Sequence, residues 1–265
     1  MSDQTASLPG PGHGESSSAR SYGSYLALHE LLSLQRPLSR PEHPDELLFI
    51  VVHQSSELWF KVILHELETL VERLVSVDVL GATFAVRRLN ALMRIVTDQL
   101  SALDTLPPQR FAQFRGYLGS SSGSQSAQFR ALEAASGLRD PNFIQAIWEH
   151  GEPTDLVKRW LDRPTLQSLF EQVLADEGTT LEEVYSAPEP SALLMLAEEL
   201  LAYEQQFARW RFLHVQLVER IIGPATMGTG GTLGARYLSR TVAQRFFPKL
   251  WDVRSKFFGS SPPTG

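Results

Sequence analysis

Two histidines occupy positions where the sequence pattern favours apolar side chains. His53 lies inside the apolar segment LLFIVVHQSSELWFKVILHEL, residues 47–67, and His214 interrupts an apolar stripe between Trp210 and Leu217. A single histidine on an apolar helix face is most often a packed ring with one hydrogen bond. A neutral imidazole is also the commonest metal ligand in proteins. Two such rings in one chain therefore favour a metal or cofactor site.

The composition limits the kinds of metal site. The chain has no cysteine, which excludes thiolate nucleophiles, zinc–thiolate sites, iron–sulfur clusters and covalent haem attachment. A histidine in the seam of a helical bundle suits a non-covalent haem, with His214 as proximal ligand and His53 on the open side. The alternative is a non-haem iron site that uses His53, Glu57 and His65. His65 lies about 120° around the helix from His53, so one ion cannot easily bind both.

The apolar periodicity is helical along most of the chain. It predicts long helices over residues 45–75, 81–104 and 191–222, and shorter ones over 24–34, 125–136, 141–149, 165–176 and 236–250. The sequence has few alternating strand patterns and no βαβ spacing. We therefore predict an all-α fold, a helical bundle with additional short helices outside it and the haem held within the bundle.

Composition also predicts the limits of the domain and the partners. Residues 1–20 are rich in Gly, Ser and Pro and lack the apolar core of a secretory signal, so we expect a disordered tail. Residues 21–258 should form a single helical domain, followed by a short C-terminal tail over 259–265.

The net charge of −6 argues against a nucleic-acid surface, and no apolar run reaches the length of about 18 residues that a membrane span needs. Without cysteine, a cytoplasmic location is the natural expectation.

Two polar segments that contain several glycines interrupt the helical pattern. They are FRGYLGSSSGSQSAQFR, residues 114–130, and MGTGGTLGARYL, residues 227–238. A flexible linker is the simplest interpretation of each. The stretch GTGGTLG is not a dinucleotide-binding motif, because Leu233 stands where the third glycine should be and a helix precedes it.

Several stretches together resemble the tryptophan 2,3-dioxygenase family over nearly the whole chain after residue 20. They are YGSYLALHELLSLQRPLS (22–39), DELLFIVVHQSSELWFKVILHELE (45–68), the glycine-bearing segment 114–130, RWRFLHV (209–215) and GTGGTLG (228–234). Their combination in this order is highly specific. The wider relation is to histidine-ligated haem-dependent aromatic oxygenases, some of which insert only one oxygen atom.

The resemblance implies roles for individual residues. It implies that His214 is the proximal ligand of haem b, with O₂ as co-substrate, and that His53 is the distal, catalytic histidine beside the indole N–H. Phe49 would line the indole pocket, and Arg115 would pair with the substrate carboxylate. Ser122 would be a polar residue near haem and substrate.

The resemblance also implies how the site closes. Thr229 would contact the ammonium and carboxylate of the substrate, and both glycine-bearing segments would act as substrate lids. Family members are homotetramers in which the N-terminal segment of a neighbouring subunit closes the pocket. In this chain Tyr22, Tyr25 and Leu26 would do so.

Two positions depart from the family pattern. Phe111 stands where a tyrosine is common, and Ser124 stands where a phenylalanine is usual. Losing a hydroxyl donor to a charged partner costs about 1–3 kcal/mol. Two enzymatic hypotheses follow: 2,3-dioxygenation of L-tryptophan to N-formylkynurenine, or monooxygenation of a substituted tryptophan such as β-methyltryptophan to an oxindole-type product. A non-catalytic haem sensor is the third hypothesis, although a sensor needs no residues that bind an amino acid.

Overall fold

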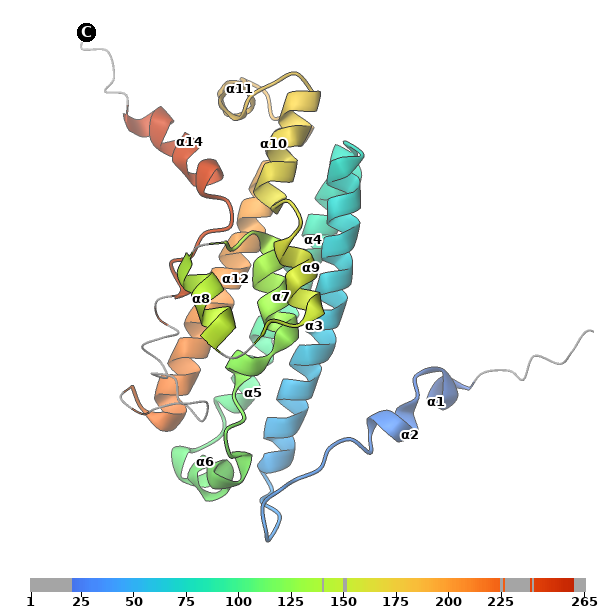
Figure 1. Ribbon diagram of the computed structural model, residues 1–265, viewed down its shortest axis with the longest axis vertical. Helices are drawn as coiled ribbons and strands as arrows, with labels where there is room; N and C mark the ends of the chain where they lie inside the picture. Colours follow the sequence, from blue (N-terminus) through green and yellow to red (C-terminus); the bar gives the residue numbers. More distant parts are fainter. Residues whose placement is uncertain are drawn as a thin grey trace, which may run out of the picture. The chain divides into compact units, whose positions relative to one another are not determined.

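The computed structural model describes residues 21–139, 141–149, 152–224, 226, 239 and 241–259. Within these ranges the regular elements are helices, with no β-strand, which confirms the predicted all-α class (Figure 1). Contacts divide the chain into two units, residues 1–36 and 37–265, which are described separately. The predicted tail boundaries at residues 20 and 258 stay predictions.

The described part of the first unit contains two short helices, α1 (Tyr22–Tyr25) and α2 (Leu28–Leu31). The sequence pattern predicted one helix over 24–34. Ala27 adopts a left-handed conformation (φ 49°), which a continuous α-helix cannot include, so the helix is divided there. Tyr22 and Tyr25 are 75% and 70% exposed.

The second unit is built on three long helices, α3 (Glu46–Val75), α4 (Val79–Asp98) and α12 (Ala192–Ile222). The shorter helices are α5 (Leu100–Leu103), α6 (Pro108–Arg115), α7 (Ala127–Ser136), α8 (Pro141–Glu149), α9 (Asp155–Leu161), α10 (Leu166–Asp176), α11 (Leu181–Ser186) and α14 (Pro248–Gly259), with the 3₁₀ turns η1 (Gly116–Leu118) and η2 (Gly123–Gln125). The long helices predicted over 45–75 and 191–222 are thus present almost to the residue. The predicted helix over 81–104 is divided into α4 and α5.

Capping residues set the ends of the long helices. The Asp78 side chain accepts a hydrogen bond from the Gly81 N–H at 2.8 Å, and Ser191 accepts one from the Leu194 N–H at 3.1 Å. Each cap satisfies a backbone donor that has no partner within the helix. Gly223 ends α12 with φ 85°, a conformation that costs a glycine little.

The core of the second unit forms where α4 packs against both α3 and α12 (Figure 1). Its fully buried side chains include Ile63, Leu67 and Leu70 of α3, Val86, Leu89 and Met93 of α4, and Leu196, Leu200 and Tyr203 of α12. Burying one such aliphatic side chain stabilises the fold by roughly 1.5–3 kcal/mol. α7 packs on α3 and α9, and α10 packs on α3.

By length and composition, α3 is also the one described helix that could span a membrane, with a mean hydropathy of 1.4 over its most apolar window. Its apolar residues Ile63 and Leu67 are completely buried by the rest of the protein. A helix that contributes to the core of a folded unit passes the same test, so this finding is weak evidence for a membrane span.

A buried carboxylate explains why the helix predicted over 236–250 is interrupted: among its described residues, 239, 241 and 248–250 are helical and 242–247 are not. The backbone N–H groups of Phe246 and Phe247 donate to the buried Glu204 side chain, at 2.6 and 2.8 Å, and are thus bonded outside any helix. Pro248 then starts α14, because proline suits the first turn of a helix and not its interior.

Candidate functional site

His53 lies in the second turn of α3, and its ring packs against the ring of Phe49 with centroids 4.2 Å apart. Its Nδ1 is 2.7 Å from the Phe49 carbonyl oxygen. A carbonyl only accepts hydrogen bonds, so Nδ1 carries the hydrogen and the Nε2 lone pair is left available. His53 can therefore accept a hydrogen bond from a ligand N–H.

The environment of His53 favours the neutral ring. Solvent reaches part of the side chain, yet burial by the surrounding protein lowers the pKa of His53 below its usual range. The Phe49 carbonyl and the Glu57 carboxylate act in the opposite direction without reversing the shift. At neutral pH His53 is an uncharged acceptor.

His214 lies in the last three turns of α12, and its ring stacks on Trp210 with centroids 5.0 Å apart and an interplanar angle of 27°. The described part of the chain provides no hydrogen bond to either ring nitrogen of His214. Burial, and to a smaller extent the electrostatic influence of His53, lower the pKa of His214 to about 4. The two imidazoles are therefore close enough to interact electrostatically, although they belong to different helices.

Other elements hold these two helices apart. Close packing joins each of α3 and α12 to α4, while no comparable packing joins α3 to α12 among the described residues. On the α7 side, Gln128 donates to the Glu57 carbonyl of α3 at 2.9 Å, and Arg211 of α12 donates to Glu133 at 2.8 Å. The helices that carry His53 and His214 are thus spaced by their neighbours.

Aromatic side chains surround Trp210. Phe129 of α7 lies 4.6 Å from the Trp210 ring and Phe60 of α3 lies 6.5 Å from it, measured between centroids. Around His53, the ring of Phe49 lies 5.5 Å from Phe111. Flat apolar rings favour a flat apolar ligand.

These residues fit a haem better than a non-haem iron. His214 offers a neutral imidazole with no hydrogen-bond partner in the described chain, stacked on Trp210 and close enough to a second histidine to interact with it electrostatically. A non-haem centre normally takes three protein ligands. The described residues contain no group of three His, Asp or Glu side chains placed to hold a metal, and the Glu57 carboxylate accepts a hydrogen bond from Gln128 at 2.8 Å.

The other predicted substrate residues lie on α6 and on the segment that follows it. Phe111 and Phe114 are buried, with Phe49 packed against both, and Arg115 ends α6 one turn after Phe111. Helical spacing places Arg115 on the same face as Phe111. The structure thus brings Phe49, His53 and Phe111 together, with Arg115 adjacent along α6.

The linker interpretation of residues 114–130 is wrong, because most of the segment has regular structure. It includes the end of α6, both 3₁₀ turns and the start of α7. Ser122 caps η2 through a capping box with Gln125, and the hydroxyl oxygens of Ser122 and Ser124 are 3.0 Å apart. The proposed lid function of this segment stays a prediction.

Four predicted residues have no described position relative to the two histidines. Thr229 lies outside the described residues, as does the whole second glycine-bearing segment, residues 227–238. Tyr22, Tyr25 and Leu26 belong to the first unit.

Helical spacing had placed Phe60 on the same face of its helix as His53, and sequence reasoning missed Phe114 and Phe129, which complete the aromatic surroundings. Phe114 could have been found from its position three residues after Phe111 on one helix, had α6 been predicted. The proline at the first position of α6 was the signal that could have predicted the start of this helix. Phe129 had no signal in the sequence, because its contact with Trp210 joins different helices.

An all-α unit with two imidazoles from different helices and aromatic side chains around them is typical of helical haem proteins. A family model for tryptophan 2,3-dioxygenase matches residues 7–149 and 167–257. The chain belongs to the tryptophan 2,3-dioxygenase family, which confirms the resemblance seen in the sequence. The family consists of haem-dependent oxidoreductases that incorporate O₂.

Individual relatives support the same assignment. The chain is 38% identical to a tryptophan 2,3-dioxygenase from Kineococcus radiotolerans over 260 residues, covering 89% of this chain and 91% of the relative. It is 39% identical to the enzyme of that name from Caulobacter vibrioides, over 89% of this chain and 97% of the relative. For the Xanthomonas oryzae pv. oryzae enzyme the identity is 36%, with 92% and 90% covered.

Proposed function

We propose that this protein is a haem-dependent oxygenase that cleaves the indole 2,3-bond of L-tryptophan to give N-formylkynurenine. The observation that carries the proposal is the pair of neutral imidazoles, His214 without a hydrogen-bond partner in the described chain and His53 with its Nε2 available. Membership of the family supplies the substrate and the reaction class.

His214 would hold haem b through a ring nitrogen, and stacking on Trp210 would orient the imidazole. Bound haem supplies the binding and activation of O₂, because triplet O₂ does not react directly with a closed-shell indole. Trp210, with Phe60 and Phe129 packed on it, would help to exclude water from this side of the site.

His53 would orient the substrate ring. Its Nε2 lone pair can accept the indole N–H, because Nδ1 is already engaged by the Phe49 carbonyl. Phe49 and Phe111 offer aromatic surfaces on which an indole can pack. Holding the reacting carbons in one orientation turns a random encounter into a positioned one.

Arg115 would fix the other end of the substrate. A guanidinium can bind a carboxylate with two parallel hydrogen bonds, which sets both distance and orientation. Ser122 and Thr229 would add polar contacts, and closure of the two glycine-bearing segments would exclude water during the reaction. Phe111 brings no hydroxyl to this end, so Arg115 carries more of the carboxylate binding than it would beside a tyrosine.

Oxygen-isotope labelling tests the proposed reaction. With ¹⁸O₂ and L-tryptophan we expect both labelled atoms in N-formylkynurenine when the product is analysed at once by mass spectrometry. One labelled atom in an oxindole-type product would instead support monooxygenation, for which Phe111 and Ser124 would be the specificity residues. Binding of O₂ to the reduced protein without consumption of any tryptophan analogue would indicate a sensor.

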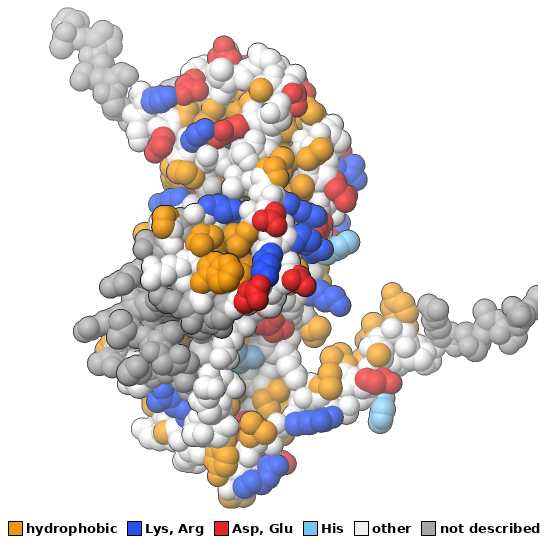
Figure 2. Space-filling view, in the orientation of Figure 1, with side chains coloured by type: hydrophobic (Ala, Val, Ile, Leu, Met, Phe, Trp, Pro, Cys, Tyr) orange, Lys and Arg blue, Asp and Glu red, His pale blue; other side chains and the backbone are white. Residues whose placement is uncertain are grey.

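The protein should assemble as a homotetramer in which Tyr22, Tyr25 and Leu26 complete a neighbour's site. Exposed apolar residues support association, including Leu47, Val51, Leu58 and Val62 of α3, which are 49%, 44%, 51% and 39% exposed. The visible face mixes acidic and basic side chains and offers no large basic patch for nucleic acid (Figure 2). Sedimentation equilibrium at the mass of a monomer would contradict the assembly.

A further inference from the structure

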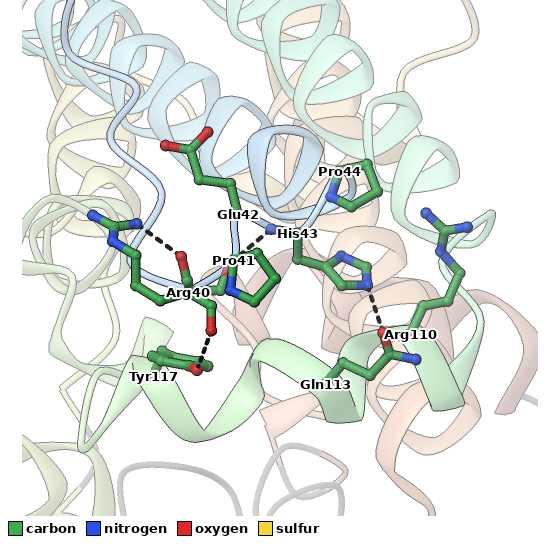
Figure 3. Close-up of a pocket in the computed structure, with 9 residues that line it drawn as sticks. Arg40, Pro41, Glu42, His43, Pro44, Arg110, Gln113 and Tyr117 are labelled. Atoms are coloured by element: carbon green, nitrogen blue, oxygen red, sulfur yellow. Dashed lines mark hydrogen bonds between the residues drawn. The ribbon is translucent and has the colours of Figure 1, made fainter.

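A cavity of about 410 Å³ lies where residues 39–44, which precede α3, meet α6 and η1 (Figure 3). It is not the space between the two histidines. Arg110, Gln113 and Tyr117 line its wall on the α6 side, at spacings that place them on one helical face. The space between residues 39–44 and the face of α6 that carries Arg110 and Gln113 is hollow. Apolar packing therefore does not fix α6 on that face.

Polar contacts join the two sides of the cavity instead. His43 Nε2 lies 3.1 Å from Gln113 Oε1, and the Tyr117 hydroxyl donates to the Arg40 carbonyl at 3.1 Å (Figure 3). At its edge, Arg110 pairs with Asp45 through two nitrogens, with Nη2 2.7 Å from Oδ1. Each contact is partly exposed and contributes at most about 1 kcal/mol alone.

The tautomer of His43 follows from its second contact. The Asp45 backbone N–H donates to His43 Nδ1 at 3.2 Å, so Nδ1 is an acceptor and Nε2 carries the hydrogen. Nε2 therefore donates to the carbonyl oxygen of the Gln113 amide. Both nitrogens of His43 are used, which fixes the ring between α3 and α6.

The segment that carries His43 is itself anchored on α3. The His43 N–H donates to Ser39 Oγ at 2.8 Å. The buried Glu46 carboxylate, in the first turn of α3, accepts from the Leu38 and Ser39 N–H groups at 2.6 and 3.0 Å. A displacement of α6 relative to α3 must therefore break the contact between His43 and Gln113.

Phe114 and Arg115, on the neighbouring face of α6, connect the contacts around this cavity to the proposed substrate site. The His43 ring packs on Phe114 with centroids 5.1 Å apart, and Phe114 packs on Phe49 at 5.8 Å. Arg115 directly follows Phe114. The position of α6 therefore sets the distance between Arg115 and Phe49 of the indole pocket.

We propose that His43 and Gln113 are positioning residues for substrate recognition: their hydrogen bond fixes α6 so that Arg115 meets the carboxylate of an indole-bearing amino acid. This inference rests on the proposed function of Arg115. It requires that loss of the hydrogen bond weakens binding of the carboxylate and not of the indole ring.

The test compares two ligands on the haem-loaded protein, L-tryptophan and tryptamine, which lacks the carboxylate. Optical titration of His43→Ala and Gln113→Leu should show L-tryptophan binding weakened about threefold to tenfold, with tryptamine affinity unchanged, since tenfold corresponds to about 1.4 kcal/mol. The double variant should lose no more than either single variant, because both remove one hydrogen bond. His43→Gln, which can donate from a similar position, should recover most of the affinity.

His65→Ala is the matched control, because His65 is an exposed histidine of α3 away from this corner. Equal losses for both ligands would show a merely structural role and overturn the inference, as would unchanged L-tryptophan affinity in both single variants. Failure of the haem-loaded wild-type protein to bind L-tryptophan would overturn the proposed function and the inference together.

Discussion

Replacing His214 with alanine should abolish stable haem binding. Its neutral imidazole has no hydrogen-bond partner in the described chain, and burial keeps the pKa near 4, so a metal meets no competing proton at neutral pH. Loss of a residue that only supports a ligand typically costs 10- to 100-fold in metal affinity, so loss of the ligand itself should cost about 100-fold or more. The Soret absorbance per mole of protein after reconstitution with hemin measures the effect.

Two controls separate ligation from folding in this experiment. His65→Ala removes an exposed histidine from α3 and should load haem normally. Added imidazole should partly restore the Soret band of His214→Ala by filling the position of the missing ring. Circular dichroism should remain helical, since the buried core residues of α12 are unchanged. A normal Soret band and normal turnover in His214→Ala would refute the assignment of His214 as the ligand.

Replacing Arg115 with alanine should raise the KM for L-tryptophan by about 10- to 100-fold, which corresponds to the roughly 1.5–3 kcal/mol of hydrogen bonds to a charged group. The reason is the loss of the two-pronged contact with the carboxylate, which forms in the ground state as well as in the transition state. The kcat should change less, because Phe49 and His53 still orient the indole. Steady-state kinetics with the haem-loaded protein measures both constants.

Arg94→Ala is the control for this charge change, because Arg94 is exposed on α4. Arg115→Lys should recover part of the affinity, since it restores the charge without the planar fork. A fall in kcat with an unchanged KM would contradict a role in carboxylate binding and would place Arg115 in the chemical step.

The sequence predicted the long helices well because their signals are local. Apolar residues recur with helical spacing over the segments that became α3 and α12, and Gly223 marks the end of α12. The helix predicted over 236–250 is interrupted at residues 242–247 for a reason that is not local: Glu204, distant in sequence, binds the backbone of Phe246 and Phe247. α6 was missed because its eight residues carry a weak apolar pattern.

The candidate site, like the helices, could be predicted from the sequence only where its signals are local. Periodicity alone singled out His53 and His214 as histidines on apolar faces, and family resemblance gave them roles. Their proximity depends on how α3, α7 and α12 are spaced, which no single segment encodes. The contacts of His53 with the Phe49 carbonyl and of His214 with Trp210 are local, because each partner lies four residues earlier on the same helix. His43 had no signal in the sequence at all, because its importance comes from contacts with Gln113 and Asp45.

The most direct test of the central claim is an absorption spectrum of the wild-type protein, produced with ample hemin and measured before and after dithionite. Ligation by His214 predicts a coloured protein whose Soret band shifts on reduction of ferric to ferrous haem, and whose ferrous spectrum changes again when L-tryptophan is added. A colourless protein, or a haem lost on gel filtration, would contradict the claim.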